Sequence, residues 1–369
     1  MNNKFIFDIE RSSPLHAQVK QNLVRLIESG ALKAGDQIPP EVEIARKYNI
    51  SRGTVRTAMA ELAREGLISR RQKRGSVVLE KISDHAIRIG VWSPVLALEG
   101  GNLDYYVAEL EKSLRTAALD RKIILLLLPK CDRIDQVVQL MASNGIAGLL
   151  APAPRKKDKQ LLDEIQKRKI ACLSMAAKLG NGLNFIAVDH EQGAMRAVDC
   201  LARLGHKRIG FIDGSPDFYD SASRYAGYRK GLEKNRIAYD AGLAAICEKG
   251  DWRTWAEKAV LCMLKAAKPS ALITGGEHFS LGAFKAITRL GLTVPADISV
   301  IGFDDFFMAA HLVPPLTTIS QPVGELGRLG IATLLDLVKG KIKPPVQKIL
   351  QTKLIVRESV VKLAYSCKE

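Results

Sequence analysis

The first eighty residues carry apolar positions at helical spacing. Residues 14–29 present one apolar face, formed by Leu15, Val19, Leu23, Leu26 and Ile27. A shorter helix is predicted over 41–48. A third begins at Ser51 and has an apolar face formed by Val55, Ala58, Met59 and Leu62. Two strand-like runs, 67–70 and 76–79, follow. Three helices and a β-hairpin predict a winged helix-turn-helix domain.

From residue 87 onward, apolar strand-like runs alternate with helical stretches. Examples are IILLLLP (123–129), RIGFIDG (208–214) and ISVIGFDD (298–305). Continuous apolar strands separated by helices predict parallel sheets that are covered on both faces. The series occurs twice, so we expect two α/β lobes with a ligand site where strand C-termini meet a cleft. The predicted domains are a winged helix over 1–80, a linker over 81–86 and a two-lobed domain over 87–369.

Charge adds a candidate partner to this picture. The net charge of the chain is +16, and residues 46–74 hold nine Lys and Arg against two acidic residues. Such a local basic run favours nucleic acid, although a generally lysine-rich chain is the alternative. Hydrophobic residues make up 47% of the chain, as in a globular protein. The six cysteines form no C-x-x-C pair, and no secretory signal or membrane span is evident, so we expect a soluble cytoplasmic protein.

The start of the third predicted helix has the features of a DNA-reading segment. Ser51 is a good N-cap, and Arg52 and Arg56 are four residues apart on one helical face. Both arginines can reach guanine edges or phosphates from the major groove, and Thr54 can contact a base or the backbone. The basic turn over 72–75 suits phosphate or minor-groove contact. The alternative is a solvated basic helix and turn.

Residues 14–78 resemble the GntR-family winged helix. The matching motifs are the turn GALKAGD, the helix start SRGTVR and the R-G of the wing. By this resemblance the DNA contacts are Arg52, Thr54, Arg56, Lys73, Arg74 and Gly75. Where the family usually has P-S-E-R, this chain has Pro39–Pro40–Glu41–Val42. Proline can still begin the helix, but Val42 replaces a frequent DNA-contacting arginine, so we expect a changed operator sequence at that position.

The remainder of the chain resembles the LacI/GalR family. The motifs are GHKRIGF (205–211), VPADISVIGFDD (294–305) and PPLTTI (314–319). The resemblance runs from about 87 to 360 and implies a two-lobed type I periplasmic-binding-protein-like fold without a cofactor or metal. A GntR head on a LacI-type body is the layout of the arabinose-repressor subgroup. By this resemblance we expect a homodimer that binds double-stranded operator DNA and a sugar or related metabolite.

Five residues are the candidates for effector binding by this resemblance. Asp304 follows a strand where the family's hydroxyl-binding Asp lies; its alternative role is a helix cap. Arg224 matches a pocket arginine, or else forms a surface salt bridge. Trp252 matches a pocket aromatic residue, or else packs in the core. Tyr105 and Tyr106 follow the first strand, and one of the two can be a core residue.

Other positions depart from the family's pocket. Ala176 and Ala177 stand where Asp-Arg is usual, and Gly276 and Glu277 stand where Asn-Asp is usual. Polar groups that recognise hydroxyls are therefore missing or changed, and hydroxyl recognition weakens steeply without them. We expect a sugar that is held differently, a modified sugar or another metabolite.

These features predict a transcription regulator, most simply a repressor, and not an enzyme. The pair Asp189–His190 could be read as catalytic, but the resemblance makes it a helix start. A transport-type solute-binding protein is the alternative function, although it would not use residues 1–80. An enzyme on a two-lobed fold would need a reactive constellation in the cleft, and none is evident in the sequence.

Overall fold

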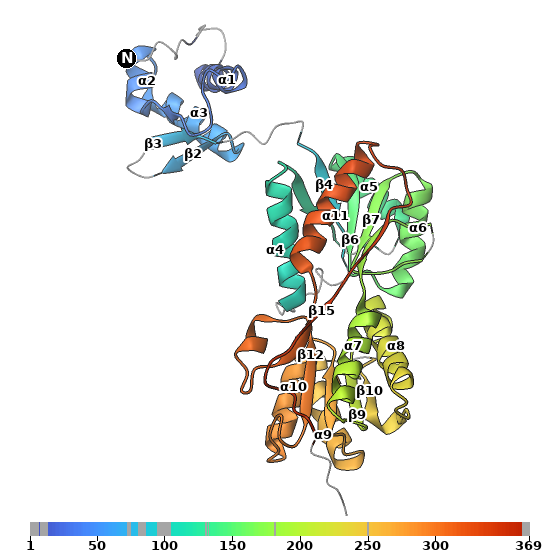
Figure 1. Ribbon diagram of the computed structural model, residues 1–369. Helices are drawn as coiled ribbons and strands as arrows, with labels where there is room; N and C mark the ends of the chain where they lie inside the picture. Colours follow the sequence, from blue (N-terminus) through green and yellow to red (C-terminus); the bar gives the residue numbers. More distant parts are fainter. Residues whose placement is uncertain are drawn as a thin grey trace, which may run out of the picture. The chain divides into compact units, whose positions relative to one another are not determined.

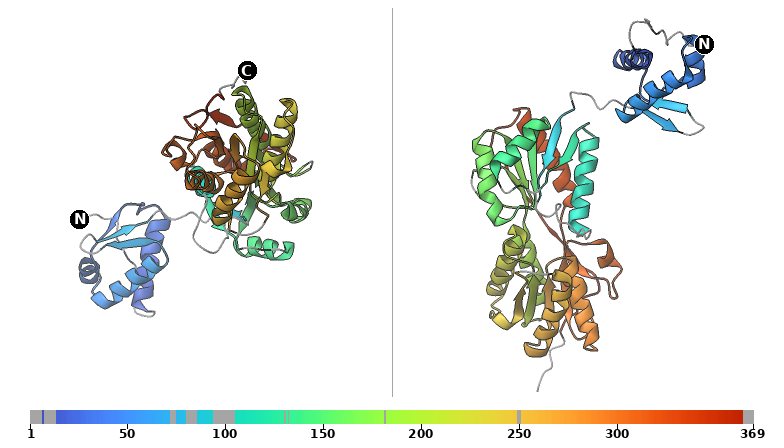
Figure 2. Two further views of the ribbon diagram at one scale, coloured as in Figure 1. Left: turned by 90° about the horizontal axis from the view of Figure 1, so that it is seen from below. Right: turned by 180° about the vertical axis from the view of Figure 1, so that it is seen from behind.

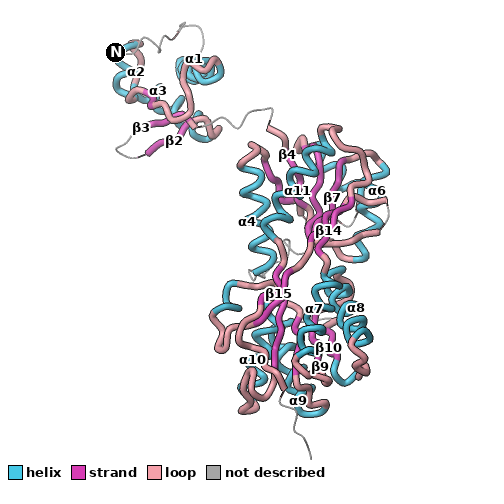
Figure 3. Tube along the Cα trace, in the orientation of Figure 1, coloured by secondary structure: helices cyan, strands magenta, loops and turns pink. Residues whose placement is uncertain are grey.

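The structure is a computed structural model that describes residues 7, 14–71, 75–79, 86–93, 105–129, 131, 133–180, 182–248 and 251–363. The chain divides into two units, Met1–Ala86 and Ile87–Glu369. Figures 1 and 2 show the elements of each unit, and Figure 3 separates the helices from the strands.

The first unit is a winged helix. Its elements are α1 (Leu15–Glu28), β1 (Gln37–Ile38), α2 (Glu41–Lys47), α3 (Arg52–Arg64), β2 (Ile68–Arg71) and β3 (Gly75–Val78). The strands pair antiparallel in the order β1-β3-β2. The three predicted helices and the hairpin are present, and β1 is an addition that the pattern did not predict, because a two-residue strand carries no periodicity.

One apolar core holds the winged helix together. The predicted faces of α1 and α3 meet in it, since Val19, Leu23, Val55 and Leu62 are fully buried. Ile38 from β1 closes the same cluster. The helices therefore pack by the stripes that the sequence displays, and the opposite face of α3 is left to solvent.

The second unit begins with a lobe built on a six-stranded parallel sheet. The strands are β4 (Arg88–Val91), β5 (Ile124–Leu127), β6 (Ile146–Pro152), β7 (Ala171–Met175), β8 (Phe185–Val188) and β14 (Gln347–Leu350). Their order is β5-β4-β6-β7-β8-β14. The helices are α4 (Tyr105–Leu119), α5 (Ile134–Ser143), α6 (Lys159–Lys167) and α11 (Val323–Val338), with the short turn η1 (Lys156–Asp158). We call this lobe 1 (Figure 1).

Lobe 2 repeats the plan. Its strands are β9 (Ile209–Asp213), β10 (Ala244–Ile246), β11 (Ala271–Thr274), β12 (Ser299–Phe303), β13 (Thr317–Ser320) and β15 (Lys353–Ile355). Their order is β10-β9-β11-β12-β13-β15, and only β15 pairs antiparallel among them. The helices are α7 (His190–Arg203), α8 (Tyr219–Lys234), α9 (Trp252–Ala266) and α10 (Glu277–Arg289), with the turns η2 (Ala241–Leu243) and η3 (Phe307–Ala310). Every residue of β9, β11 and β12 is buried, as expected for strands covered on both faces.

Three described connections cross between the lobes. They run from β8 into α7, from β13 into α11, and from β14 into β15. The red and orange C-terminal part of the chain consequently contributes to both lobes (Figure 1). The pattern predicted two lobes in succession, whereas lobe 1 is completed by α11 and β14 from the end of the chain.

Helices α7 and α8 approach each other very closely at a glycine. The Cβ of an alanine at position 227 would lie 2.1 Å from the carbonyl oxygen of Glu191, and one at Gly231 would lie 2.8 Å from the Cβ of Val198. These glycines let the first half and the middle of α7 lie against the second half of α8. The two helices thereby bring His190 and Arg224 to one place.

We predict that Gly227→Ala destabilises the second unit by about 1–3 kcal/mol, because backbone atoms of α7 must shift to admit the methyl group. The measurement is urea unfolding followed by tryptophan fluorescence, since Trp92, Trp252 and Trp255 are the protein's three tryptophans and all lie in this unit. Gly324→Ala is the matched control. Gly324 lies in the first turn of α11 with no atom within 4 Å of an added Cβ, so alanine there should be neutral or stabilising. Equal unfolding free energies for G227A and the wild type would contradict the packing argument.

Candidate DNA-binding surface and effector site

The start of α3 presents two arginines to solvent. Ser51 caps the helix, and its Oγ accepts a hydrogen bond from the backbone N–H of Thr54 at 3.0 Å, as predicted. The side chains of Arg52 and Arg56 are 61% and 58% exposed and lie one turn apart. Free N–H groups at a helix start and two adjacent guanidiniums can engage phosphates and guanine edges.

Glu41 at the start of α2 lies between these arginines. Its Oε2 atom is 3.4 Å from Nε of Arg56 and 3.7 Å from Nε of Arg52. Exposed ion pairs contribute little stability, so the contact with Glu41 leaves the two guanidiniums available to another partner. The sequence pattern does not predict a role for Glu41, because its distance from Arg56 depends on how α2 packs against α3.

The other predicted DNA contacts have mixed outcomes. Gly75 opens β3 with a positive φ of 83°, which favours glycine. Lys73 and Arg74 lie outside the described residues. Val42 is exposed on α2, the position where the resemblance expected an arginine. The assignment of all these residues to DNA contact remains a prediction.

The candidate effector site lies at the carboxyl ends of the lobe 2 strands. Asp213 ends β9 and is fully buried. Arg224 of α8 is 4% exposed and donates two hydrogen bonds to it, from Nε to Oδ2 at 2.7 Å and from Nη2 to Oδ1 at 3.0 Å. A second carboxylate, that of Asp220, accepts from Nη1 of Arg224 at 3.1 Å. Arg224 is therefore neither free in a pocket nor at the surface, but holds a bidentate buried ion pair.

Two consecutive glycines after β11 make room for two carboxylates. An added Cβ at Gly275 would lie 2.1 Å from Oδ1 of Asp213, and one at Gly276 would lie 2.9 Å from Oδ2 of Asp304. Asp304 follows β12 with a φ of 83° and accepts a hydrogen bond from Nε2 of Gln321 at 2.5 Å. The side chain of Asp304 does not cap η3, whose N-cap is Phe306 without a side-chain bond. The predicted departure at Gly276 thus accommodates Asp304.

His190 is buried beside this cluster. It is 3% exposed, and neither of its ring nitrogens has a hydrogen-bond partner. Burial and, to a smaller extent, the positive charge of Arg224 lower the pKa of His190 to about 4. The ring is therefore neutral at pH 7. Burial opposes the charge on Arg224 as well, but the charges of Asp213 and Asp220 outweigh it and raise the pKa of Arg224 well above its ordinary value.

Aromatic rings form another side of the site. Trp252, at the start of α9, lies 5.7 Å from the ring of Phe279 and 5.9 Å from that of Phe218, between ring centroids. An added Cβ at Gly214, the residue after Asp213, would lie 3.4 Å from Cζ2 of Trp252. Trp252 is partly buried against the lobe 2 core. It therefore packs in the core and lies beside the candidate site at the same time.

The two lobes touch at the rim of this site. The backbone N–H of Tyr105 in lobe 1 donates to Oε2 of Glu277 at 3.4 Å, and the Tyr105 ring packs against the lobe 2 core. On another side Arg155 of lobe 1 forms a β-bridge with Phe218 and places its guanidinium 5.2 Å from that ring centroid. Glu277, predicted as a departure from the family's pocket, is therefore a contact between the lobes.

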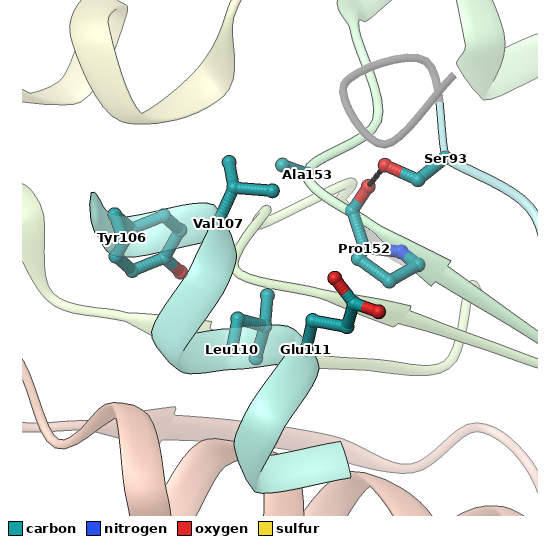
Figure 4. A pocket seen from close by; sticks show the side chains of 7 residues that line it. All are labelled: Ser93, Tyr106, Val107, Leu110, Glu111, Pro152 and Ala153. Atoms are coloured by element: carbon teal, nitrogen blue, oxygen red, sulfur yellow. Dashed lines mark hydrogen bonds between the residues drawn. The ribbon is translucent and has the colours of Figure 1, made fainter. Parts of the chain in front are cut away.

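Tyr106 has a different environment from Tyr105. It packs against the lobe 1 core and lines a small cavity between α4 and the end of β6 (Figure 4). The cavity also touches Val107, Glu111 and Ala153, and Oγ of Ser93 donates to the carbonyl of Pro152 at its edge at 2.9 Å. Its volume of about 10 Å³ is on the order of one water molecule. Both tyrosines therefore pack against an apolar core, Tyr105 against that of lobe 2 and Tyr106 against that of lobe 1.

Several residues near the site were missed or differently interpreted from sequence. Ala176 and Ala177 are buried in the apolar core, and Asp189 caps α7 by accepting from the backbone N–H of Gln192 at 3.0 Å, as expected of a helix start. Asp213 was missed, although a carboxylate at the end of the apolar run IGFID was a usable signal. Gln321 carried no such signal, because only the parallel pairing of β12 with β13 brings it to Asp304.

Comparison with known proteins gives two family matches. Bacterial regulatory proteins of the gntR family match residues 15–78, and the periplasmic binding protein-like domain matches residues 198–360. The first unit is therefore a GntR-type helix-turn-helix, and the second contains a periplasmic-binding-protein-like domain.

Named relatives align with part or with nearly all of the chain. The HTH-type transcriptional regulator AscG of Escherichia coli is 35% identical over 49% of this chain, and the chain spans only 53% of that protein. The arabinose metabolism transcriptional repressor of Geobacillus stearothermophilus is 26% identical over 95% of this chain and 98% of that protein. Among solved structures, a lac repressor dimer bound to operator and the anti-inducer ONPF has a TM-score of 0.65 at 25% identity, covering 76% of this chain and 96% of that one.

These matches confirm the predicted fold class, an N-terminal winged helix followed by a two-lobed periplasmic-binding-protein-like domain with parallel sheets. The relatives are transcription regulators by name, in agreement with the predicted class of function and not with a transport-type solute-binding protein. None of the described helices combines the length and the apolar character that a bilayer span requires.

The burial of His190 generates a pH prediction. Unfolded His190 takes up a proton near pH 6.5, but the folded site does so only near pH 4, so stability falls as the pH falls through this window. Between pH 7 and pH 5 we expect this residue to account for a loss of about 2 kcal/mol in the free energy of unfolding. Urea unfolding by tryptophan fluorescence should give a loss smaller by this amount in His190→Gln than in the wild type.

His278→Gln is the control for this measurement, because His278 lies partly exposed on α10 of the same lobe. This variant should retain the full wild-type loss. An identical loss in H190Q and in the wild type would refute the buried neutral state of His190.

Proposed function

We propose that this protein is a sequence-specific DNA-binding transcription regulator, a repressor whose operator affinity is changed by a sugar or related metabolite bound between the two lobes. The layout is that of an arabinose repressor, a GntR head on a LacI-type body. A relative named as the arabinose metabolism repressor aligns over 95% of the chain and supports this layout. The identity of arabinose as effector does not follow, because Ala176 and Ala177 place apolar groups where polar ones were expected.

The exposed pair Arg52 and Arg56 carries the DNA-binding part of the proposal. A helix whose first turn is capped by Ser51 and carries two oriented guanidiniums fits a major groove. The net charge of +16 adds a favourable electrostatic contribution to binding that salt weakens. We infer that Thr54, Lys73, Arg74 and Gly75 make further contacts with operator DNA.

The charged cluster of lobe 2 carries the effector part. Asp304 follows β12, Arg224 lies in the second turn of α8 and Trp252 begins α9. Tyr105 and Arg155 of lobe 1 contact lobe 2 at Glu277 and Phe218 beside them. A ligand held by groups from both lobes binds the closed arrangement better than the open one, and this difference in affinity is what can shift a conformational equilibrium. We infer that closure changes the geometry of the dimer and releases DNA, which makes the effector an inducer.

Exposed apolar side chains support a homodimer. Val313 and Phe307, in the segment between β12 and β13, are 92% and 67% exposed, and Met308 is exposed beside them. Large apolar side chains that are exposed together in one surface segment indicate an interaction site. The lac repressor structure, similar in fold, is a dimer. We infer that this segment contributes to the dimer interface.

We predict that Arg52→Ala lowers affinity for operator DNA by roughly 10- to 100-fold, the range expected for the loss of one bidentate base contact. The operator sequence is first obtained by selection from a random DNA library with the wild-type protein. A fluorescence-anisotropy titration at fixed salt then compares the variants.

Arg64→Ala is the matched control, because Arg64 is an exposed arginine in the last turn of the same helix. The operator affinity of Arg64→Ala should stay within about threefold of that of the wild type, because this variant loses only one positive charge that attracts DNA phosphates. Undiminished binding by R52A, or equal losses in both variants, would refute the assigned reading end of α3.

We further predict that Val313→Asp weakens self-association at least tenfold, since a charge would be buried without a partner at the interface. Sedimentation equilibrium measures the dimer dissociation constant. Ile349→Asp, at an exposed apolar position of β14 in lobe 1, should leave it unchanged. An unaltered dimer in V313D would show that the patch lies outside the interface.

A further inference from the structure

Asp213 is the main hydrogen-bond partner of Arg224, the one guanidinium buried in lobe 2 among the described residues. Nε and Nη2 of Arg224 donate to the two Asp213 oxygens, Nη2 also donates to Ser221 at 3.1 Å, and Nη1 donates to Asp220. The face of the guanidinium lies 5.4 Å from the ring centroid of Phe303. Each side of Arg224 is therefore satisfied by the protein itself, and little of it remains for a ligand anion.

The charges around the site are predominantly negative. Asp213, Asp220, Asp304 and Glu277 face Arg224 of lobe 2 and Arg155 of lobe 1 within the described part of the site. Asp305 is neutralised by Arg357, whose Nη2 lies 2.7 Å from its Oδ1. A phosphate or carboxylate entering here would meet an excess of like charge in a poorly solvated place.

Two buried side chains, Gln321 and His190, have polar atoms without a hydrogen-bond partner. Gln321 is 8% exposed, and because its Nε2 is bound to Asp304, its partnerless Oε1 lies on the same amide beside that carboxylate. Both ring nitrogens of His190 are also without partners, and the neutral ring offers one donor and one acceptor. A buried donor or acceptor without a hydrogen bond lowers the free energy of unfolding, and a ligand that supplies the partner removes this cost.

A hydroxyl or amino group satisfies this set and a phosphate does not. Gln321 Oε1 and the Asp304 carboxylate accept hydrogen bonds, which a hydroxyl donates, whereas a phosphate dianion has no proton to give. A hydroxyl oxygen can in turn accept from a His190 N–H or from Arg155. The hydrogen-bonding pattern and the negative charge of the site therefore both exclude ligands that carry a phosphate or carboxylate group.

We propose that Asp213 is a specificity-determining residue that, by retaining Arg224 in an internal ion pair, restricts the effector to polyhydroxylated or amino-bearing molecules without an acidic group. This inference rests on the proposed effector site and refines its ligand class. Phosphorylated sugars and sugar acids are excluded as effectors. Removal of Asp213 makes Arg224 available to anions.

The test is a thermal-unfolding comparison of the full-length protein, followed by tryptophan fluorescence, which reports the second unit. The probes are inorganic phosphate and glucose 6-phosphate at 10 mM, each against sodium chloride of equal ionic strength. Neither should raise the Tm of the wild type. In Asp213→Ser both should raise it by about 2 °C or more, the effect of a ligand with a Kd near 1 mM.

Two further variants locate the gained anion site. The double variant D213S/R224M, which removes both members of the buried pair, should lose the phosphate effect. Asp199→Asn, which removes an acid paired with Lys234 on the surface of the same lobe, should behave like the wild type. If D213S lacks the wild-type near-ultraviolet circular dichroism, Asp213→Asn replaces it, because its amide oxygen can still accept from Gly214 and Ser221.

Stabilisation of the wild type by either phosphate probe would overturn the proposal. So would a folded D213S or D213N that gains no response, or a gain of equal size in D199N. The outcome is separable from the proposed function. If the wild-type protein binds glucose 6-phosphate and releases operator DNA, the proposed function stands and this inference is wrong. If the protein binds no DNA but its variants show the expected response to phosphate, this inference stands and the proposed function is wrong.

Discussion

The buried ion pair between Arg224 and Asp213 is the interaction on which the rest of the effector unit depends. Removing one partner of such a pair leaves an uncompensated buried charge and typically costs about 3–5 kcal/mol. The pair joins the end of β9 to the first half of α8, and the carboxylate in turn fixes Gly275 against it. Its geometry also places the guanidinium over Phe303, so that the ends of β9, β11 and β12 are tied together by one side chain.

Much of the architecture follows from residue patterns. The apolar stripes of α1 and α3 and the Ser51 cap predict the winged helix almost element by element, because local periodicity and capping decide its helices. The buried strands of both lobes are also visible as apolar runs. The strand β1 cannot be predicted from the sequence, because two residues show no periodicity. The return of α11 and β14 to lobe 1 cannot be predicted either, because the local residue pattern does not depend on which distant segments pair.

The candidate site divides in the same way. Resemblance places Arg224, Asp304 and Trp252 near one another, but the sequence cannot tell that Asp213 already occupies Arg224 or that Gly276 accommodates Asp304. These relations join residues from different strands and helices, and only the fold supplies the distances. In the winged helix, Glu41 of α2 reaches Arg52 and Arg56 of α3 for the same reason.

The crossing of the chain between the lobes has a consequence for biosynthesis. The sheet of lobe 1 reaches its full width only when β14 adds to β8, and α11 precedes that strand by a few residues, so a ribosome must pass residue 350 before lobe 1 can close. Lobe 2 lies between, and most of its strands are translated while lobe 1 still lacks part of its cover. Pairings of such large sequence separation are slow to form and leave apolar surface exposed meanwhile. The nascent effector unit therefore passes through a long incomplete stage, in which the apolar surface of lobe 1 that α11 and β14 later cover is exposed.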